Sequence, residues 1–285
     1  TEDTAYVINA SDLLAGFSDV EGSTLSVVNL SASNGTLSAF NAATGSWTFT
    51  PNANYNGTVN LSYGVSDGAA ITPVTQSFAL AAVNDAPTGG ATISGTPTQN
   101  QTLTAANTLA DVDGLGAISY QWLAGGAAIA GATSASLVLT QAQVGKAISV
   151  RAGYTDQKGT AESVTSASTA AVANVNDAPT GAVTISGVAS QNQILTAGHT
   201  LMDADGLGTV SYQWLANGAV IAGATASSLA LTQAHVGKAI SVRAGYTDGF
   251  GAAESMMSAA TTAVANVNDA PTGTVSLQRT GTAVT

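Results

Sequence analysis

The feature that most constrains this chain is a tandem repeat with a period of 92 residues. The peptide ANVNDAPTG occupies residues 173–181 and returns unchanged at 265–273, and AAVNDAPTG occupies 81–89. The aspartates of the three copies are equally spaced (177 − 85 = 92 and 269 − 177 = 92), and residues 85–176 match residues 177–268 at 67 of 92 positions. A repeat of this length indicates consecutive units that each fold around their own core.

The repeat divides the chain into four predicted parts. Residues 1–84 are a domain of similar size and different sequence that ends in the same linker. Residues 85–176 and 177–268 are the two copies. Residues 269–285 are expected to be a linker followed by the first strand of a further unit, either truncated or completed by a partner chain.

Short strands separated by Gly, Asn and Asp turns are expected throughout. The peptide AISVRAGY alternates Ile148, Val150 and Tyr154 with small or polar residues, which is the period of a half-buried strand. Trp122 and Trp214, both in YQWL, are the expected core anchors. The Ala-rich segments lack a sustained spacing of 3.6 residues, so helix is not expected. The pattern predicts an all-β fold of tandem antiparallel β-sandwich domains in an extended array.

Composition narrows the possible partners. Six basic and 17 acidic residues give a net charge of −11, which disfavours nucleic acid and anionic membranes. No apolar run approaches the length of a membrane span, so membrane insertion is not expected. The chain has no cysteine, so it needs a staple other than a disulfide, and a bound metal is one such staple.

The acidic residues recur at corresponding places in the two copies. Each copy has a DxDG turn before its Trp strand and a loop beginning YTD between its last two strands. Because strands alternate in direction in a seven-stranded sandwich, both loops are expected at the end where the chain enters, beside the linker aspartate. Five carboxylates gathered there would repel one another by several kcal/mol without a cation. The candidate ligands are Asp85, Asp111, Asp113, Asp156 and Glu162 in the second domain and Asp177, Asp203, Asp205, Asp248 and Glu254 in the third.

Calcium is the predicted cation, because it prefers six to eight oxygen ligands from carboxylates and carbonyls. The linker asparagines and Asp269 could add oxygens, and the first domain is expected to hold its own site where its chain enters, facing a preceding domain. The alternative is that these acids only form turns in loops exposed to solvent. The further candidates are Asn84, Asn176, Asn268 and Asp269 in the linkers, and Glu2, Asp3, Asp19, Glu21 and Asp67 in the first domain.

Several motifs resemble the repeats of giant bacterial surface proteins. EDTAYVIN, FSDVEGSTL, WTFTPNANYNGT, YGVSDG and VNDAP resemble cadherin-like repeats, and SYQWLANG, VGKAISVRAGYTD and VNDAPT resemble immunoglobulin-like repeats of the same proteins, which include RTX-type adhesins and biofilm-associated proteins. The resemblance implies an extracellular rod on the bacterial cell surface, with calcium stiffening its joints and an adhesive tip held away from the cell. Two features depart from the family: Glu21 stands where Asp is commoner, and no glycine-rich RTX nonapeptide is present.

An enzyme is not expected. GVSDG at 64–68 fits the GxSxG pattern, but that nucleophile needs a strand-to-helix elbow and a histidine, and residues 1–84 contain no histidine. Acid pairs that recur at every linker are typical of a structural device rather than of a catalytic centre. Two other functions remain open: a module that binds a glycan or protein, and a subunit of a self-assembling filament or sheath in which residues 272–285 complete a neighbouring copy's sheet.

Overall fold

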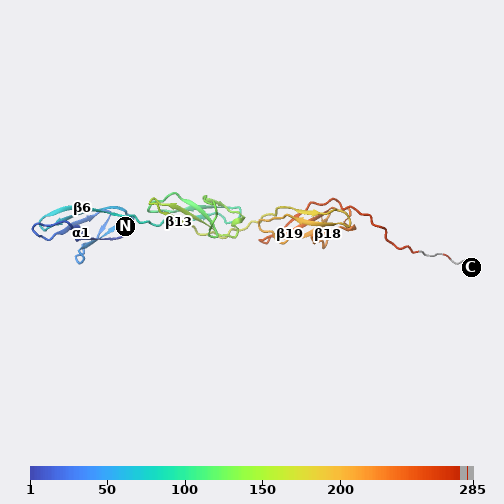
Figure 1. Cartoon of the computed structure of the whole chain (residues 1–285), viewed down its shortest axis with the longest axis horizontal. Coiled ribbons are helices and arrows are strands. Elements are labelled where there is room, and N and C mark those ends of the chain that lie inside the picture. Colours follow the sequence, from blue (N-terminus) through green and yellow to red (C-terminus); the bar gives the residue numbers. More distant parts are fainter. Residues whose placement is uncertain (277–280, 282–285) are drawn as a thin grey trace. The chain divides into compact units, whose positions relative to one another are not determined.

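The computed structural model describes residues 1–276 and residue 281, and nearly all of its regular structure is antiparallel β-sheet (Figure 1). The predicted strand within 272–285 falls mostly outside the described residues. Contacts between Cα atoms group the chain into two compact units, and the boundary between them passes through the second predicted domain, so the predicted domain limits stay predictions. The N-terminal unit contains residues 1–94, 104–137 and 148–169, and the C-terminal unit contains 95–103, 138–147 and the residues from 170 onward.

Residues 1–84 form two three-stranded sheets around one core. The elements are β1 (Tyr6–Asn9), α1 (Ala10–Leu13), β2 (Ser26–Ala32), β3 (Gly35–Leu37), β4 (Ser46–Pro51), β5 (Gly57–Ser66) and β6 (Ile71–Leu80). The sheet orders are β1-β4-β3 and β2-β5-β6. Phe49 of β4 and Val59 of β5 are fully buried between them, and the single helical turn α1, which the sequence did not predict, buries Leu13 in the same core.

The second predicted domain, residues 85–176, contains one three-stranded and one four-stranded sheet. Their orders are β11-β8-β7 and β10-β9-β12-β13. The elements are β7 (Ala91–Ser94), β8 (Thr102–Asn107), β9 (Ser119–Ala124), β10 (Ala127–Ala128), β11 (Ser136–Val138), the 3-10 turn η1 (Gln141–Gln143), β12 (Ile148–Thr155) and β13 (Ala161–Thr165).

The third predicted domain, residues 177–268, repeats this arrangement, with sheet orders β14-β15-β18 and β17-β16-β19-β20. The predicted antiparallel all-β class is confirmed. The elements are β14 (Val183–Ser186), β15 (Ile194–His199), β16 (Ser211–Ala216), β17 (Ala219–Val220), β18 (Ser228–Ala230), the 3-10 turn η2 (Gln233–His235), β19 (Ile240–Thr247) and β20 (Ala253–Met257).

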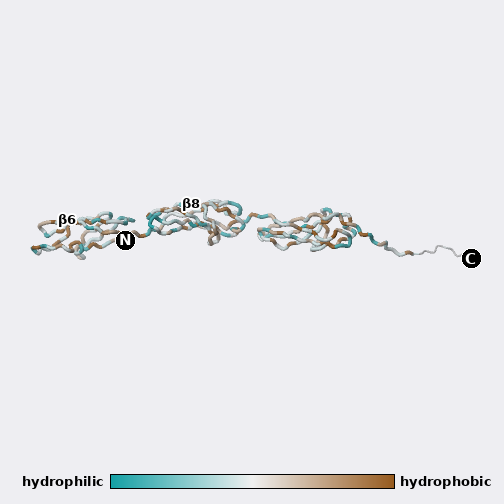
Figure 2. The backbone as a smooth tube through the Cα atoms, turned by 45° about the horizontal axis from the view of Figure 1, so that its top comes forward, coloured by the Kyte–Doolittle hydropathy of each residue, from teal (hydrophilic) through white to brown (hydrophobic). Residues whose placement is uncertain are grey.

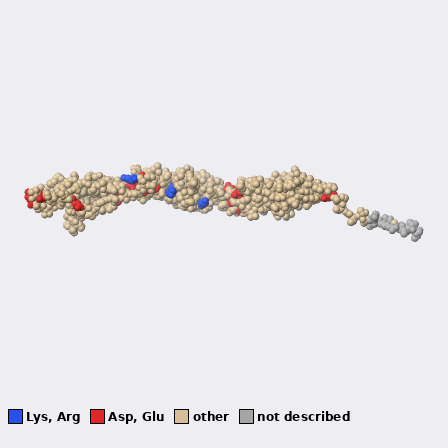
Figure 3. Space-filling view, viewed as in Figure 1, with Lys and Arg blue, Asp and Glu red and all other residues tan. Residues whose placement is uncertain are grey.

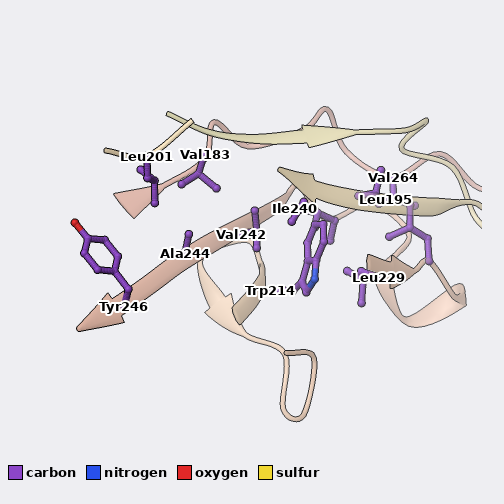
Figure 4. Close-up of a cluster of buried hydrophobic side chains, with 12 residues drawn as sticks. Val183, Leu195, Leu201, Trp214, Leu229, Ile240, Val242, Ala244, Tyr246 and Val264 are labelled. Atoms are coloured by element: carbon purple, nitrogen blue, oxygen red, sulfur yellow. The ribbon is translucent and has the colours of Figure 1, made fainter. Parts of the chain in front are cut away.

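The predicted tryptophan anchors are confirmed. Trp214 has no exposed surface and lies among Leu195, Leu229 and Ile240 (Figure 4). Its indole Nε1 donates a hydrogen bond of 2.9 Å to the Ala226 carbonyl, so the polar group of this buried ring is satisfied. Trp122 is equally buried, and its Nε1 donates to the Ser134 carbonyl at 2.8 Å.

The central strand pairs of the two copies have the same sequences and the same register. β9 and β16 both read SYQWLA, and β12 and β19 both read ISVRAGYT. Ile148 lies opposite Ala124, and Ile240 lies opposite Ala216. Ile148, Val150 and Tyr154 are buried, which confirms the alternation expected from the sequence, and Figure 2 shows apolar and polar residues interleaved along the tube.

Candidate metal centres

The N-terminal unit gathers a linker, two loops of the second domain and the start of the chain around one group of acids, here named the first linker cluster. Asp111 and Asp113 lie in the turn between β8 and β9, while Asp156 and Glu162 lie around the loop between β12 and β13. Acidic side chains visible in Figure 3 gather in a few groups, with mostly uncharged surface and a few basic side chains between them. The members of the cluster are Glu2, Asp3, Asp85, Asp111, Asp113, Asp156 and Glu162.

The DxDG turn is shaped by its own side chain and by two glycines. Asp111 Oδ1 accepts a hydrogen bond of 2.8 Å from the Asp113 amide, and Gly114 has a φ of +97°, which favours glycine. Gly116 lies directly against the Thr155 carbonyl, where a Cβ atom would overlap the oxygen. The Gln157 amide donates to the Gly114 carbonyl at 3.2 Å, so the turn is held against the loop that follows β12.

The linker is hydrogen-bonded to both loops. The Asp85 amide donates to Asp113 Oδ2 at 2.8 Å, and Asn84 Nδ2 donates to Glu162 Oε1 at 2.7 Å. These bonds confirm the predicted convergence of three segments. The amide nitrogen of Asn84, rather than its oxygen, faces the acids, so its contribution here is to hold Glu162.

Tyr154 belongs to this cluster, although the sequence indicated only its place in an inward-facing strand pattern. Its hydroxyl lies within hydrogen-bond distance of Asp111 Oδ2 and, at 2.7 Å, of Glu162 Oε2. Burial raises the pKa of Tyr154, and both carboxylates raise it further, so the phenol keeps its proton. The hydrogen bond from Tyr154 in turn lowers the pKa of Asp111. The protonated phenol is therefore a hydrogen-bond donor placed between two carboxyl groups.

Replacing Tyr154 by Phe is expected to lower the free energy of unfolding by about 1–3 kcal/mol in the presence of chelator, because two carboxylates then face each other without their shared donor. Urea unfolding followed by tryptophan fluorescence measures this loss. The matched control is Tyr55→Phe, which removes an exposed hydroxyl bonded to the Thr58 carbonyl at 2.8 Å. An equal loss in both variants would contradict the assigned role of Tyr154.

The sequence predicted that Glu2 and Asp3 belong to a separate site facing a preceding domain, and this prediction is wrong. Glu2 Oε1 accepts from the Val83 amide at 2.7 Å, so Glu2 lies at the linker that leaves the first domain. β1 pairs antiparallel with β4, with Tyr6 opposite Phe49, so residues before Tyr6 extend past the end of β4. The loop there leads into β5, whose first residue lies opposite the last residue of β6, next to the linker.

Asp3 lies at the same end of the first domain as Glu2. Asp3 Oδ1 accepts from the Asn54 amide at 2.9 Å, in the loop between β4 and β5. Asn56 of that loop donates through Nδ2 to Glu2 Oε2 at 3.2 Å. The first linker cluster therefore contains two carboxylates more than the sequence predicted for it.

Two buried carboxylate oxygens in the first linker cluster have no hydrogen-bond partner among the described residues, namely Asp85 Oδ2 and Asp156 Oδ2. Asp156 is only 5% exposed, and its other oxygen accepts from the Lys158 and Thr160 amides. An unpaired buried carboxylate oxygen is costly, and a cation with oxygen ligands removes that cost. No three acids or histidines within residues 1–276 form a ready-made metal arrangement, so the fit to calcium rests on these orphaned oxygens.

The C-terminal unit contains a second linker cluster, in which the linker makes the same two bonds to the loops. The Asp177 amide donates to Asp205 Oδ2 at 2.7 Å, and Asn176 Nδ2 donates to Glu254 Oε1 at 2.7 Å. The hydroxyl of Tyr246 bonds to Asp203. Asp248 Oδ2 is a buried orphan like its counterpart Asp156 Oδ2. The members of this cluster are Asp177, Asp203, Asp205, Asp248 and Glu254.

The remaining candidates lie elsewhere. Asp19 and Asp67 line one small pocket of the first domain, away from Glu2 and Asp3. Asp67 Oδ1 accepts from the Ala69 and Ala70 amides, which lower the pKa of Asp67, so turn formation accounts for this acid. Glu21 and Asn268 are exposed. Asp269 Oδ2 accepts from Gln191 Nε2 at 2.9 Å.

Comparison with protein families finds a match for the first domain. Residues 1–81 match the cadherin-like domain family. This match confirms the resemblance of the first domain to cadherin-like repeats, and it covers the cadherin-like domain alone, not the two copies that follow. No curated protein matches the chain in sequence.

Three solved structures with partial likeness to this chain are distant relatives in sequence. An adhesin described as a Ca2+-stabilized adhesin that helps an Antarctic bacterium reach out and bind ice is 14% identical, with 94% of this chain and 74% of that chain covered and a TM-score of 0.32. Human CDH23 EC21-23 is 14% identical, with 82% and 87% covered and a TM-score of 0.31. An endo-fucoidan hydrolase of glycoside hydrolase family 107 is 14% identical, with 94% and 42% covered and a TM-score of 0.21. TM-scores of this size do not establish a common fold.

Within the part of the chain that the structure describes, every helix is too short or too polar to cross a membrane.

Proposed function

We propose that this chain is a calcium-stiffened extender region of a bacterial cell-surface adhesin, which projects a distal binding domain for attachment to cells or surfaces. The observation that carries the proposal is the set of buried, unpaired carboxylate oxygens at both linkers. The cadherin-like domain at residues 1–81 and the motif resemblance of the two copies favour adhesion over the other open functions. The recurrence of one acidic arrangement at two linkers suits a structural role rather than catalysis.

The proposed mechanism is electrostatic. Bound calcium supplies a concentrated positive charge that accepts six to eight oxygen ligands. In the first linker cluster those oxygens would come from Asp85, Asp113 and Asp156, with Asp111 and Glu162 oriented by Tyr154. Without a cation the same carboxylates repel one another and the linker loosens. Calcium at the millimolar concentrations found outside cells suits such a site, because extracellular modules bind calcium in the 10⁻⁴–10⁻³ M range.

Calorimetric titration of the 285-residue chain with calcium tests the proposal, together with small-angle scattering in calcium and in EDTA. We expect at least two binding sites and a longer average end-to-end distance with calcium, because short-range coordination holds each linker. Replacing Asp111 and Asp113 together by Asn should remove the sites of the first linker cluster only. The control is Asp12→Asn, which removes one exposed charge outside both clusters.

Two results would contradict the proposed function. One is the absence of calcium binding, and the other is a scattering profile that is the same in calcium and in EDTA. If calcium does not bind, the loop acids act as turn formers.

A further inference from the structure

Glu2 and Gln99 occupy equivalent positions at the two linkers. Glu2 Oε1 accepts from the Val83 amide at 2.7 Å, and Gln99 Oε1 accepts from the Val175 amide at 3.0 Å. Each valine precedes its linker aspartate by two residues (85 − 83 = 2 and 177 − 175 = 2). Glu2 is 1% exposed and Gln99 is 3% exposed. The same buried position therefore holds a carboxylate at the first linker and a neutral amide at the second.

The difference between Glu2 and Gln99 decides whether the side chain of the linker aspartate has a hydrogen-bond donor. Gln99 Nε2 donates to Asp177 Oδ2 at 2.7 Å. The side chain of Glu2 has no N–H to donate, and Asp85 Oδ2, the corresponding oxygen, is a buried orphan. The pattern recurs further along the C-terminal unit, where Gln191 Nε2 donates to Asp269 Oδ2 at 2.9 Å.

The charges around Asp85 also favour a bound cation at the first linker. The carboxylates of Asp113, Asp3 and Glu2 lie close enough to Asp85 to repel its carboxylate, and Asp85 Oδ2 is buried without a donor to offset that repulsion. The nearby cation Lys158 donates to Asn56 Oδ1 at 3.3 Å, where its bond goes to an amide and not to an acid.

The second linker cluster has a further amide. Gln141 Nε2 donates to Asp205 Oδ1 at 3.0 Å, while Gln141 Oε1 and Asp248 Oδ2 are buried without partners in the described residues. These two oxygens keep the cluster suited to a cation. The linker aspartate itself is held separately, by Gln99.

From these contacts we infer that Gln99 takes the place of a cation in holding the linker aspartate Asp177. The hydrogen bond between Gln99 and Asp177 fixes the linker aspartate of the second linker without calcium, whereas Asp85 lacks such a donor and is fixed in the same way when a divalent cation lies between Glu2 and Asp85. The inference rests on the proposed calcium-dependent function and adds to it that the two linkers respond differently. On loss of calcium, the first linker loosens and the second persists.

Amide hydrogen exchange of the full chain, resolved at Val83 and Val175 by NMR, tests the inference with calcium alone as the probe. In EDTA we expect the Val175 amide to stay protected and the Val83 amide to exchange about tenfold faster or more, since a hydrogen bond to a charged group is lost when the linker opens. Adding calcium should restore protection at Val83 and change Val175 little.

Two exchanged variants sharpen the test. Glu2→Gln gives the first linker the amide of the second, so the Val83 amide should become protected in EDTA. Gln99→Glu gives the second linker the carboxylate of the first, so the Val175 amide should become dependent on calcium. Glu2→Gln removes a buried charge and keeps the side-chain shape, so this variant still reports on the inference if Gln99→Glu fails to fold.

The outcomes separate the inference from the proposed function. Equal calcium dependence at both amides would overturn the inference and leave the proposed function standing. Bound calcium with no change at Val83 would also overturn the inference alone. No calcium binding in calorimetry would overturn both.

Discussion

Replacing Trp214 by Ala is expected to lower the free energy of unfolding of the third domain by about 3–5 kcal/mol. The side chain has no exposed surface, so its removal leaves a large cavity among Leu195, Leu229 and Ile240. It also leaves the Ala226 carbonyl without the indole donor. A loss of this size is a large fraction of the stability of a domain of about ninety residues. Urea unfolding monitored by circular dichroism measures it.

The matched variant is Trp122→Ala, which should destabilise the second domain by a similar amount, because Trp122 is equally buried and donates to Ser134 in the same way. The control is Trp47→Phe, since Trp47 of the first domain is only partly buried. A loss below about 1 kcal/mol for Trp214→Ala would contradict its role as a core anchor.

Replacing Asp156 by Asn is expected to have opposite effects in calcium and in EDTA. The amide oxygen of Asn can still accept from the Lys158 and Thr160 amides, so the turn is kept. In EDTA the variant loses an unpaired buried charge and should be as stable as the wild type, or more stable by about 1–3 kcal/mol. In calcium it should lose most of the stabilisation that the ion supplies, which is about 1.4 kcal/mol when calcium stands at ten times the dissociation constant.

Thermal unfolding of the wild type and of the Asp156→Asn variant, each in calcium and in EDTA, measures this reversal of their relative stability. Asp248→Asn is the matched change in the second linker cluster, and Asp12→Asn controls for the loss of one surface charge. If Asp156→Asn is destabilising by the same amount in both conditions, the orphaned oxygen has no part in binding an ion.

Much of the fold and of the two clusters could be predicted from the sequence. The strands around Trp122 and Trp214 have a clear two-residue period, and turn residues mark their ends. The convergence of Asp85, Asp113 and Glu162 followed from strand direction alone, because alternating strands return their loops to the same end.

The failures have physical reasons. The placement of Glu2 depends on which strand β1 pairs with, and the pairing with β4 is a long-range choice that local periodicity does not contain. The two-residue period explains Tyr154 as an inward-facing strand residue, so the pattern gives no sign that its hydroxyl bonds to the acids. Gln99 carries no charge and lies outside every acidic motif, so only the contact with Asp177 reveals its role.

The identity of the central strand pairs has a consequence for refolding. Because β9 equals β16 and β12 equals β19 in sequence, β9 can pair with β19 in the native register and form the same backbone bonds. The native pairing closes a loop of 24 residues (148 − 124) and the exchanged pairing one of 116 (240 − 124). The longer loop costs about 1.4 kcal/mol more in chain entropy, so entropy alone favours correct pairing only about tenfold. After a stretched array is released from tension, domain-swapped neighbours are therefore an expected minority product.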